Sequence, residues 1–274
     1  MASDLTGGKE SEIARPDVAP ADQAPPSPEA EPHRSRFFVI YMLLALALAA
    51  AIVGVVVFAG RSINPGPTWS SWKPSGGGLG AAQQIAERVS GSYHLPGGKQ
   101  LVDVIAKPPS FSSGNKTVPI PVIAVRGSRG KFDEVLGVTP SNSVWYSLCG
   151  LGASCSIATG TPSLSRGTLV RREILELALY TFKYVKGVQH VVAFMPPRNA
   201  RKPPSVVYLQ KTDVAPELKS PLTTTLPPKV PLPSTITARE QKTIDSTTGA
   251  RIYTFGLSQT QQGDAVLVLT PIPG

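Results

Sequence analysis

Histidine and cysteine are scarce in this chain of 274 residues, which holds three histidines and two cysteines. His33 lies near the N-terminus, His94 in a turn rich in Gly and Pro, and His190 at the start of an apolar run. None of them stands at a metal-ligand spacing from an acidic residue. The sequence therefore predicts no metal site.

The chain also lacks the Gly-x-Ser-x-Gly motif of nucleophilic catalysis. The nearest approach, Gly152-Ala153-Ser154-Cys155-Ser156, lacks the final glycine of a Gly-x-Ser-x-Gly elbow. Residues 61–274 hold only eleven acids, and the adjacent Asp133-Glu134 do not converge on one site in a helix or a strand. We expect no enzyme, and an envelope hydrolase is the weakest of three functional hypotheses.

A nucleotide cofactor is not expected either. Gly76-x-Gly78-x-x-Ala81 is similar to a dinucleotide fingerprint, but that fingerprint needs a strand before it to aim the helix at a pyrophosphate. Trp-Lys-Pro-Ser stands there instead. We predict no cofactor.

One long apolar run is present, from Phe37 to Gly60, without a charged, amide or proline residue. About 20 apolar helical residues cross a ~30 Å hydrocarbon core, and this run has 24. A helix is the only form in which one isolated span satisfies its backbone groups in lipid. The sequence predicts a single transmembrane α-helix in the plasma membrane.

The flanks of this run favour a cytoplasmic N-terminus. Arg34 and Arg36 precede it and only Arg61 follows it closely, and basic flanks tend to remain cytoplasmic. The C-terminal part would then lie outside, as a signal-anchored domain. A signal peptide cleaved after Val57-Phe58-Ala59 is the alternative, but the leader and the apolar run are long for one.

Charge is unevenly divided along the chain. Residues 1–36 carry a net charge of −3, whereas residues 61–274 carry +12. A basic domain outside the membrane favours anionic partners such as phospholipid, a cell-wall polymer or an acidic envelope protein. A dispersed, merely solvating surface remains the alternative, and nucleic acid is not expected outside the membrane.

The two segments that flank the apolar run are predicted to be without a core. Residues 1–36 hold six prolines and almost no large apolar residue, which is typical of a disordered tail. Residues 61–78 form a Gly/Pro-rich stalk that carries Trp69 and Trp72. These two rings suit either a lipid headgroup interface or the underside of the domain.

Residues 79–274 are predicted to form one α+β domain with two helices and about six or seven strands. The helices are expected at 81–89 and 168–186. Residues 214–234, with six prolines, should run extended. The strands are expected at 101–106, 118–125, 144–149, 191–195 and 206–210, with a final hairpin of 251–257 and 265–270.

Three finer expectations accompany this assignment. Pro119 and Pro121 make 118–125 an edge strand, and Gly263-Asp264 suits a type II′ turn in the final hairpin. Arg172 and Glu176 form an i,i+4 pair of little energetic weight. The repeated order helix, strand, Pro-Pro, strand at 81–125 and 168–210 suggests either a duplicated unit or a coincidence.

Cys149 and Cys155 enclose a Gly-rich stretch of five residues. Outside the membrane such a pair most simply forms a disulfide. A redox-active pair is disfavoured because the spacing is not Cys-x-x-Cys, and two free thiols are the remaining alternative.

The loop between two Pro-Pro pairs carries Arg198, Arg201 and Lys202, and it is the candidate anion-contact loop. The function that the sequence favours is a membrane-anchored envelope protein whose basic domain binds an anionic surface, a wall polymer or another envelope protein. A transmembrane regulatory anchor, whose cytoplasmic tail recruits a partner, is the second hypothesis.

Overall fold

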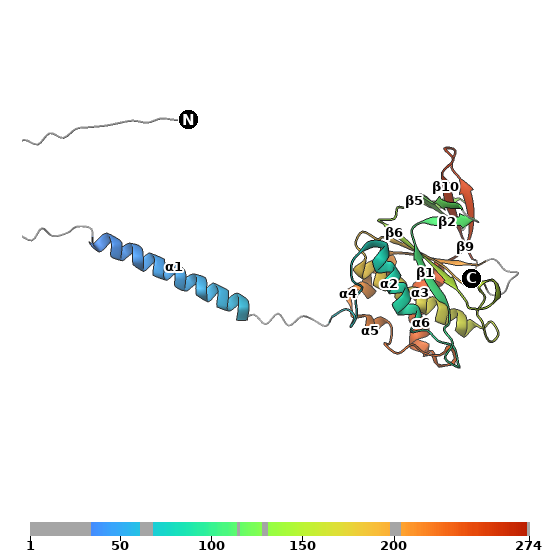
Figure 1. Cartoon of the computed structure of the whole chain (residues 1–274), viewed down its shortest axis with the longest axis horizontal. Coiled ribbons are helices and arrows are strands. Elements are labelled where there is room, and N and C mark those ends of the chain that lie inside the picture. The colour runs from blue at the N-terminus through green and yellow to red at the C-terminus, as the bar shows by residue number, and fades with distance from the viewer. Residues whose placement is uncertain (1–33, 61–67, 114–115, 128–130, 198–203, 273–274) are drawn as a thin grey trace, which may run out of the picture. The chain divides into compact units, whose positions relative to one another are not determined.

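The structure is a computed structural model that describes residues 34–60, 68–113, 116–127, 131–197 and 204–272. Two compact units divide it, residues 1–64 and residues 65–274. The first unit contains helix α1 (Arg34–Gly60) (Figure 1). Its side chains are described from Phe37 to Val53, and all of these are exposed. Among the described residues, no helix combines the length and the apolar character that crossing a membrane requires.

The second unit is an α+β domain built on a mixed sheet of eight strands, in the order β1-β6-β7-β8-β9-β10-β4-β5. The pairs β6–β7 and β10–β4 are parallel, and the other neighbours are antiparallel. The strands are β1 (Asp103–Lys107), β4 (Val122–Arg126), β5 (Phe132–Gly137), β6 (Ser143–Cys149), β7 (His190–Phe194), β8 (Val206–Gln210), β9 (Ile252–Gln259) and β10 (Ala265–Pro271). A separate hairpin pairs β2 (Ser110–Ser113) with β3 (Lys116–Pro119).

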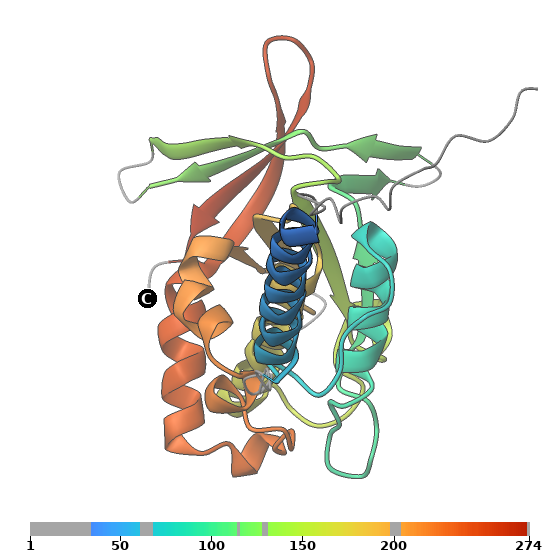
Figure 2. The same cartoon turned by 90° about the vertical axis from the view of Figure 1, so that its left-hand side faces the viewer.

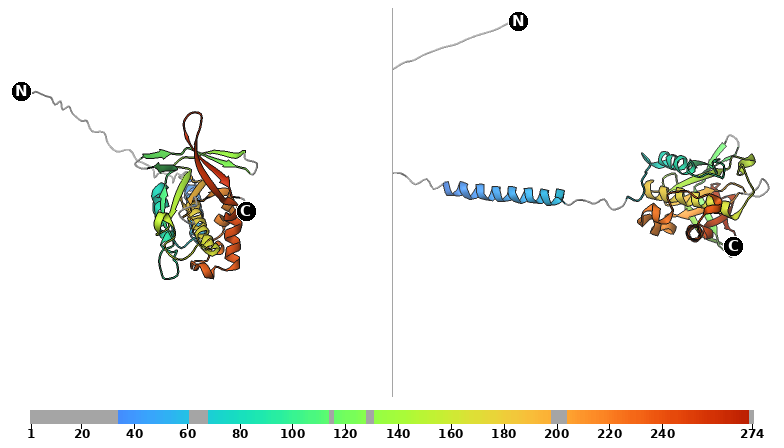
Figure 3. Two further views of the ribbon diagram at one scale, coloured as in Figure 1. Left: turned by 90° about the vertical axis from the view of Figure 1, so that its right-hand side faces the viewer. Right: turned by 90° about the horizontal axis from the view of Figure 1, so that it is seen from below.

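Three helices supply the second layer of the domain (Figure 3). They are α2 (Gly78–Ser90), α3 (Leu164–Tyr184) and α6 (Ala238–Thr248). Helix α3 begins at a Ser163 cap, whose side chain accepts from the Arg166 backbone N–H. Since α2 and α6 both pack against α3, it is the central helix of the layer.

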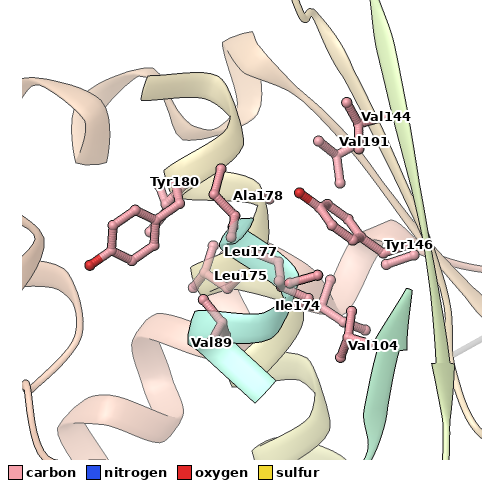
Figure 4. Packing of buried hydrophobic residues seen from close by; sticks show 14 of the residues in the cluster. Val89, Val104, Val144, Tyr146, Ile174, Leu175, Leu177, Ala178, Tyr180 and Val191 are labelled. Carbon is pink, nitrogen blue, oxygen red and sulfur yellow. The ribbon is translucent and has the colours of Figure 1, made fainter. Parts of the chain in front are cut away.

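The main core lies between this layer and the sheet. Ile174, Leu177 and Ala178 of α3 face side chains from β1, β6 and β7 (Figure 4). The Tyr146 hydroxyl reaches from β6 to Thr181 Oγ1 at 2.6 Å, so a polar contact fixes the helix within an otherwise apolar interface. The helices predicted at 81–89 and 168–186 are confirmed.

The opposite face of the sheet has a second core, which includes Trp145, Phe194 and Leu267. Gln210 on β8 donates to Glu134 on β5 at 2.8 Å, although β9, β10 and β4 separate these strands in the sheet. The sheet therefore bends back over its own second face. The β9–β10 hairpin projects beyond β4 and β5 (Figure 2).

The expected extended course of 214–234 is wrong in detail. Helices α4 (Ala215–Lys219) and α5 (Leu222–Thr225) lie there. Proline is tolerated in the first helical turn, where its missing N–H removes no bond, and Pro216 occupies that position in α4. The proline content therefore shortens the helices without excluding them.

The segment 118–125 also differs from its prediction as one edge strand. It divides at Ile120-Pro121 into the end of β3 and the start of β4. Strand β4 lies inside the sheet, between β10 and β5. Pro121 stands just before β4, so no proline removes an N–H from the pairing of this strand. The final hairpin is confirmed, but residues 260–264 separate its strands, so the two-residue turn is wrong.

The suggested duplication finds no counterpart in the topology. Strands β7 and β8 are antiparallel neighbours. In the first suggested unit, residues 118–125 are divided between β3 of the separate hairpin and β4, which is not a neighbour of β1 in the large sheet.

Candidate functional site

An open groove of about 740 Å³ lies where residues 68–73 meet the C-terminal ends of α3 and α4. We call it the Trp69 groove; its lining includes Trp69, Trp72, Tyr184, Lys73, Lys183 and Lys219. The Trp69 ring meets Tyr180 and Tyr184 edge to face, with ring centres 5.5 and 5.6 Å apart. The aromatic rings thus form one contiguous wall.

Two hydrogen bonds, to α4 and α5, hold Trp69 in this wall. Its indole N–H donates to the Glu217 carbonyl at 3.3 Å, and its own carbonyl accepts from the Leu222 N–H at 2.7 Å. Only 8% of Trp69 remains exposed. Of the two sequence-based interpretations of this ring, packing on the domain is the one that the structure shows. The folded part therefore begins before residue 79.

The charged side chains that line the groove are all basic. Lys183 Nζ donates to the Leu218 carbonyl at 2.9 Å and lies 5.5 Å from the centre of the Trp69 ring. Lys73 and Lys219 are exposed, and no acidic residue is among the lining residues that the structure describes. An aromatic wall beside ammonium groups suits a ligand with an anionic head and an apolar part.

A second feature is a buried ion-pair network between α3, α6 and the chain that follows α2. Arg172 is fully buried, and its Nε donates to Glu240 Oε1 at 2.6 Å. Its Nη2 donates to the Pro227 carbonyl at 2.7 Å, and Nη1 donates to both Glu176 and the Tyr93 hydroxyl. The guanidinium thereby joins α6 and the 214–234 segment to the central helix.

Glu173, the neighbour of Arg172, is fully buried, and neither carboxylate oxygen has a hydrogen-bond partner among the described residues. Burial raises the pKa of this carboxyl well above its ordinary value, and the charge of Glu176 raises it further. Glu173 is therefore held as the neutral acid over a wider pH range than an exposed glutamate.

A third polar cluster, formed by His190, Tyr208 and the nearby Glu134, lies on the second face of the sheet. His190 Nδ1 lies 3.0 Å from the Tyr208 hydroxyl, and the two rings are stacked. Burial lowers the pKa of His190, while the nearby Glu134 carboxylate raises it by less.

The residues singled out from the sequence fare differently. Cys149 and Cys155 form a disulfide, as predicted, with sulfur atoms 2.09 Å apart. Arg198, Arg201 and Lys202 lie outside the described residues. Within the described ranges no three His, Cys, Asp or Glu side chains gather as metal ligands.

Sequence reasoning missed the buried role of Arg172 and the whole of α6. A signal for α6 was present, since Thr237 and Glu240 have the Thr-x-x-Glu spacing of a capping box, and the Thr237 side chain does accept from the Glu240 N–H. The Trp69 groove had a signal too, in the two tryptophans of the stalk.

The comparisons with known proteins place the chain in no family. No protein family matches it, and no curated protein and no solved structure is significantly similar to it.

Proposed function

We propose that the protein is a single-pass membrane-anchored envelope protein whose extracytoplasmic domain binds anionic phospholipid headgroups through the Trp69 groove. The observation that carries this proposal is the aromatic wall of the groove beside Lys73, Lys183 and Lys219. Aromatic rings with a polar edge favour the headgroup region, and lysines near the membrane surface each add about 1 kcal/mol on anionic lipid.

The anchor in this proposal is the apolar run 37–60, which extends seven residues beyond the last described side chain, Val53. Residues 61–67 then separate Gly60 from the groove. Eight residue steps extend at most ~29 Å, so a span ending at Gly60 would keep Thr68 near the headgroups. The net charge of +12 beyond the run supports an anionic surface.

Tryptophan quenching tests the lipid contact directly. The full chain is reconstituted in lipid discs that contain brominated phosphatidylglycerol or, in parallel, brominated phosphatidylcholine. Trp72 is half-buried at the groove, whereas Trp145 is fully buried in the second core and serves as the unquenched background. We expect stronger quenching by the anionic lipid, and this excess should fall between 0.1 and 1 M salt as screening shortens from about 10 to 3 Å.

The matched variants separate the groove from general charge. Changing Lys73, Lys183 and Lys219 to Gln should remove the excess quenching. Lys99, Lys131 and Lys242 are also exposed but lie outside the groove. Changing these three to Gln gives a variant with the same net charge as the groove variant, and the excess quenching should be preserved. Equal quenching in both lipids, or equal losses in both triple variants, would refute the groove as the contact.

The anchor has its own test. After expression in a bacterial host, the chain should stay in the membrane pellet at pH 11, and the domain should be digested by protease added to intact spheroplasts. Release into the supernatant, or protection of the domain, would contradict the proposed topology.

A further inference from the structure

Arg166, in the first turn of α3, is buried without a charge partner. Only 8% of its surface is exposed, and Nε and Nη2 have no hydrogen-bond partner among the described residues. The ion pairs of the described residues do not include it. Burial lowers the pKa of its guanidinium, and no opposing charge contributes. Burying a cation without a paired anion costs free energy of folding. An unpaired arginine at this position therefore suggests that an anion from outside the chain binds it.

The position of this guanidinium is set by the chain that leads into the helix. Nη1 donates to the Thr161 carbonyl at 2.8 Å. Gly160 has φ +76°, and a Cβ there would lie 3.0 Å from Nη1, so glycine lets the chain pass close to the charge. Nε and Nη2 belong to the same guanidinium, so they lie close to the chain that leads into α3.

The same place carries the positive end of a 21-residue helix. The first N–H groups of a helix have no partner within it, and the dipole favours an anion there. The Ser163 hydroxyl already serves the Arg166 N–H, and it lies 3.1 Å from the Ser165 hydroxyl. The N–H groups of Leu164 and Ser165 remain as donors for an external group.

We propose that Arg166 and the N-terminus of α3 form a binding site for a phosphate group. A tetrahedral oxyanion takes a charge-assisted bond from the guanidinium together with backbone N–H bonds. The site is separate from the Trp69 groove, because Arg166 and Tyr184 lie 18 residues apart on α3, about 27 Å along the axis. It does not rest on the proposed lipid contact.

Titration calorimetry on the full chain in neutral detergent tests the site. Inorganic phosphate and dimethyl phosphate are titrated separately at constant ionic strength, with chloride as the balancing anion. Arg166→Gln should weaken binding by at least about tenfold, the effect of losing a hydrogen bond to a charged group. Unchanged binding by Arg166→Gln, or no binding of either probe to the unaltered chain, would overturn the proposal.

A second pair of variants avoids the core altogether. Leu164 is 88% exposed, so Leu164→Glu and Leu164→Gln leave the packing intact and differ only in a negative charge at the helix start. The glutamate should weaken phosphate binding about two- to fivefold relative to the glutamine. Equal affinities for this pair would also overturn the site, even if Arg166→Gln does not fold.

The two probes decide the source of the phosphate. Binding of dimethyl phosphate indicates an esterified phosphate, as in a lipid headgroup or a wall polymer. Binding of inorganic phosphate alone indicates the free ion.

Discussion

Arg172 Nε lies 2.6 Å from Glu240 Oε1, and this ion pair joins α3 to α6 where both side chains are almost completely buried. The adjacent Arg171 makes a comparable contact with Asp245 at 2.6 Å, but there the carboxylate is 45% exposed. Two neighbouring arginines thus bind the same helix, one inside the core and one at the surface.

The first prediction concerns this contrast. Arg172→Met should lower the free energy of unfolding by about 3–5 kcal/mol, because Glu240 is left charged and buried. Arg171→Met should cost about 1 kcal/mol or less, since an exposed pair is screened by water. Urea unfolding of both variants measures the difference, and similar losses would show that burial does not govern the pair.

The second prediction concerns Glu173. Its folded-state pKa is raised above 4.5, so the folded protein prefers the protonated form. Below pH 4.5 Glu173 is protonated in both the folded and the unfolded chain, so the folded state is not penalised. As the pH rises from 4.5 toward the folded pKa, Glu173 ionises in the unfolded chain only, and the free energy of unfolding falls. Glu173→Gln should therefore raise Tm at pH 8 and change it least at pH 4.5, with 2–4 °C for each ~1 kcal/mol gained.

Glu87 provides the control for Glu173. It is exposed on α2, and Glu87→Gln removes the same carboxylate charge without touching the core. A Glu173→Gln variant with the same pH dependence as the unaltered chain would show that this carboxyl ionises as easily folded as unfolded.

The third prediction concerns His190. Burial lowers its pKa below 6.5, so protonation favours the unfolded chain. Stability should fall as the pH drops through 6.5 toward the folded pKa, and His190→Gln should remove this acid-side loss. Chemical unfolding at pH 7.5 and 5.5 measures it; an identical loss in the variant would assign the effect to another group.

The fourth prediction concerns the disulfide. Cys149 and Cys155 are six residues apart, and closing so short a loop stabilises by about 2 kcal/mol in the chain-entropy treatment. Replacing both by Ser should lower the free energy of unfolding by that amount. Reductant should destabilise the unaltered chain similarly and leave the double variant unaffected; a reductant effect on the variant would point to another cause.

The elements with strong apolar periodicity could be predicted from the sequence, whereas α6 shows only the Thr237-x-x-Glu240 capping signal at its start. The buried side chains of α6 are Glu240, Ile244 and Thr248, a helical stripe in which only one residue is apolar. Hydrophobic periodicity does not register such a stripe, because its burial depends on the Arg172 partner that another helix supplies. The sequence did not predict that β4 lies inside the sheet either, because strand order depends on contacts between residues far apart in the sequence.

The candidate sites divide in the same way. The cysteine pair was predictable because its chemistry is local, lying within one short loop. The two tryptophans near residue 70 were visible in the sequence, but the groove was not, because its other lining residues come from distant parts of the chain. The Arg166 site is local as well, but the burial of its guanidinium becomes evident only once α3 is packed. Lys183 and Lys219 meet Trp69 only because α3 and α4 end beside the same short segment.

The bonds that hold Trp69 also determine how the domain responds to mechanical load. Any pull on the chain before residue 68 reaches the fold through Trp69, whose carbonyl and indole are bonded to Leu222 and Glu217. Those partners belong to the segment that Arg172 fastens to α3 through the Pro227 carbonyl. Tension applied before residue 68 would therefore be passed on to the central helix α3 and would not pull a single strand from the sheet. The point of attachment at Trp69 is thus among the parts of the domain most resistant to force.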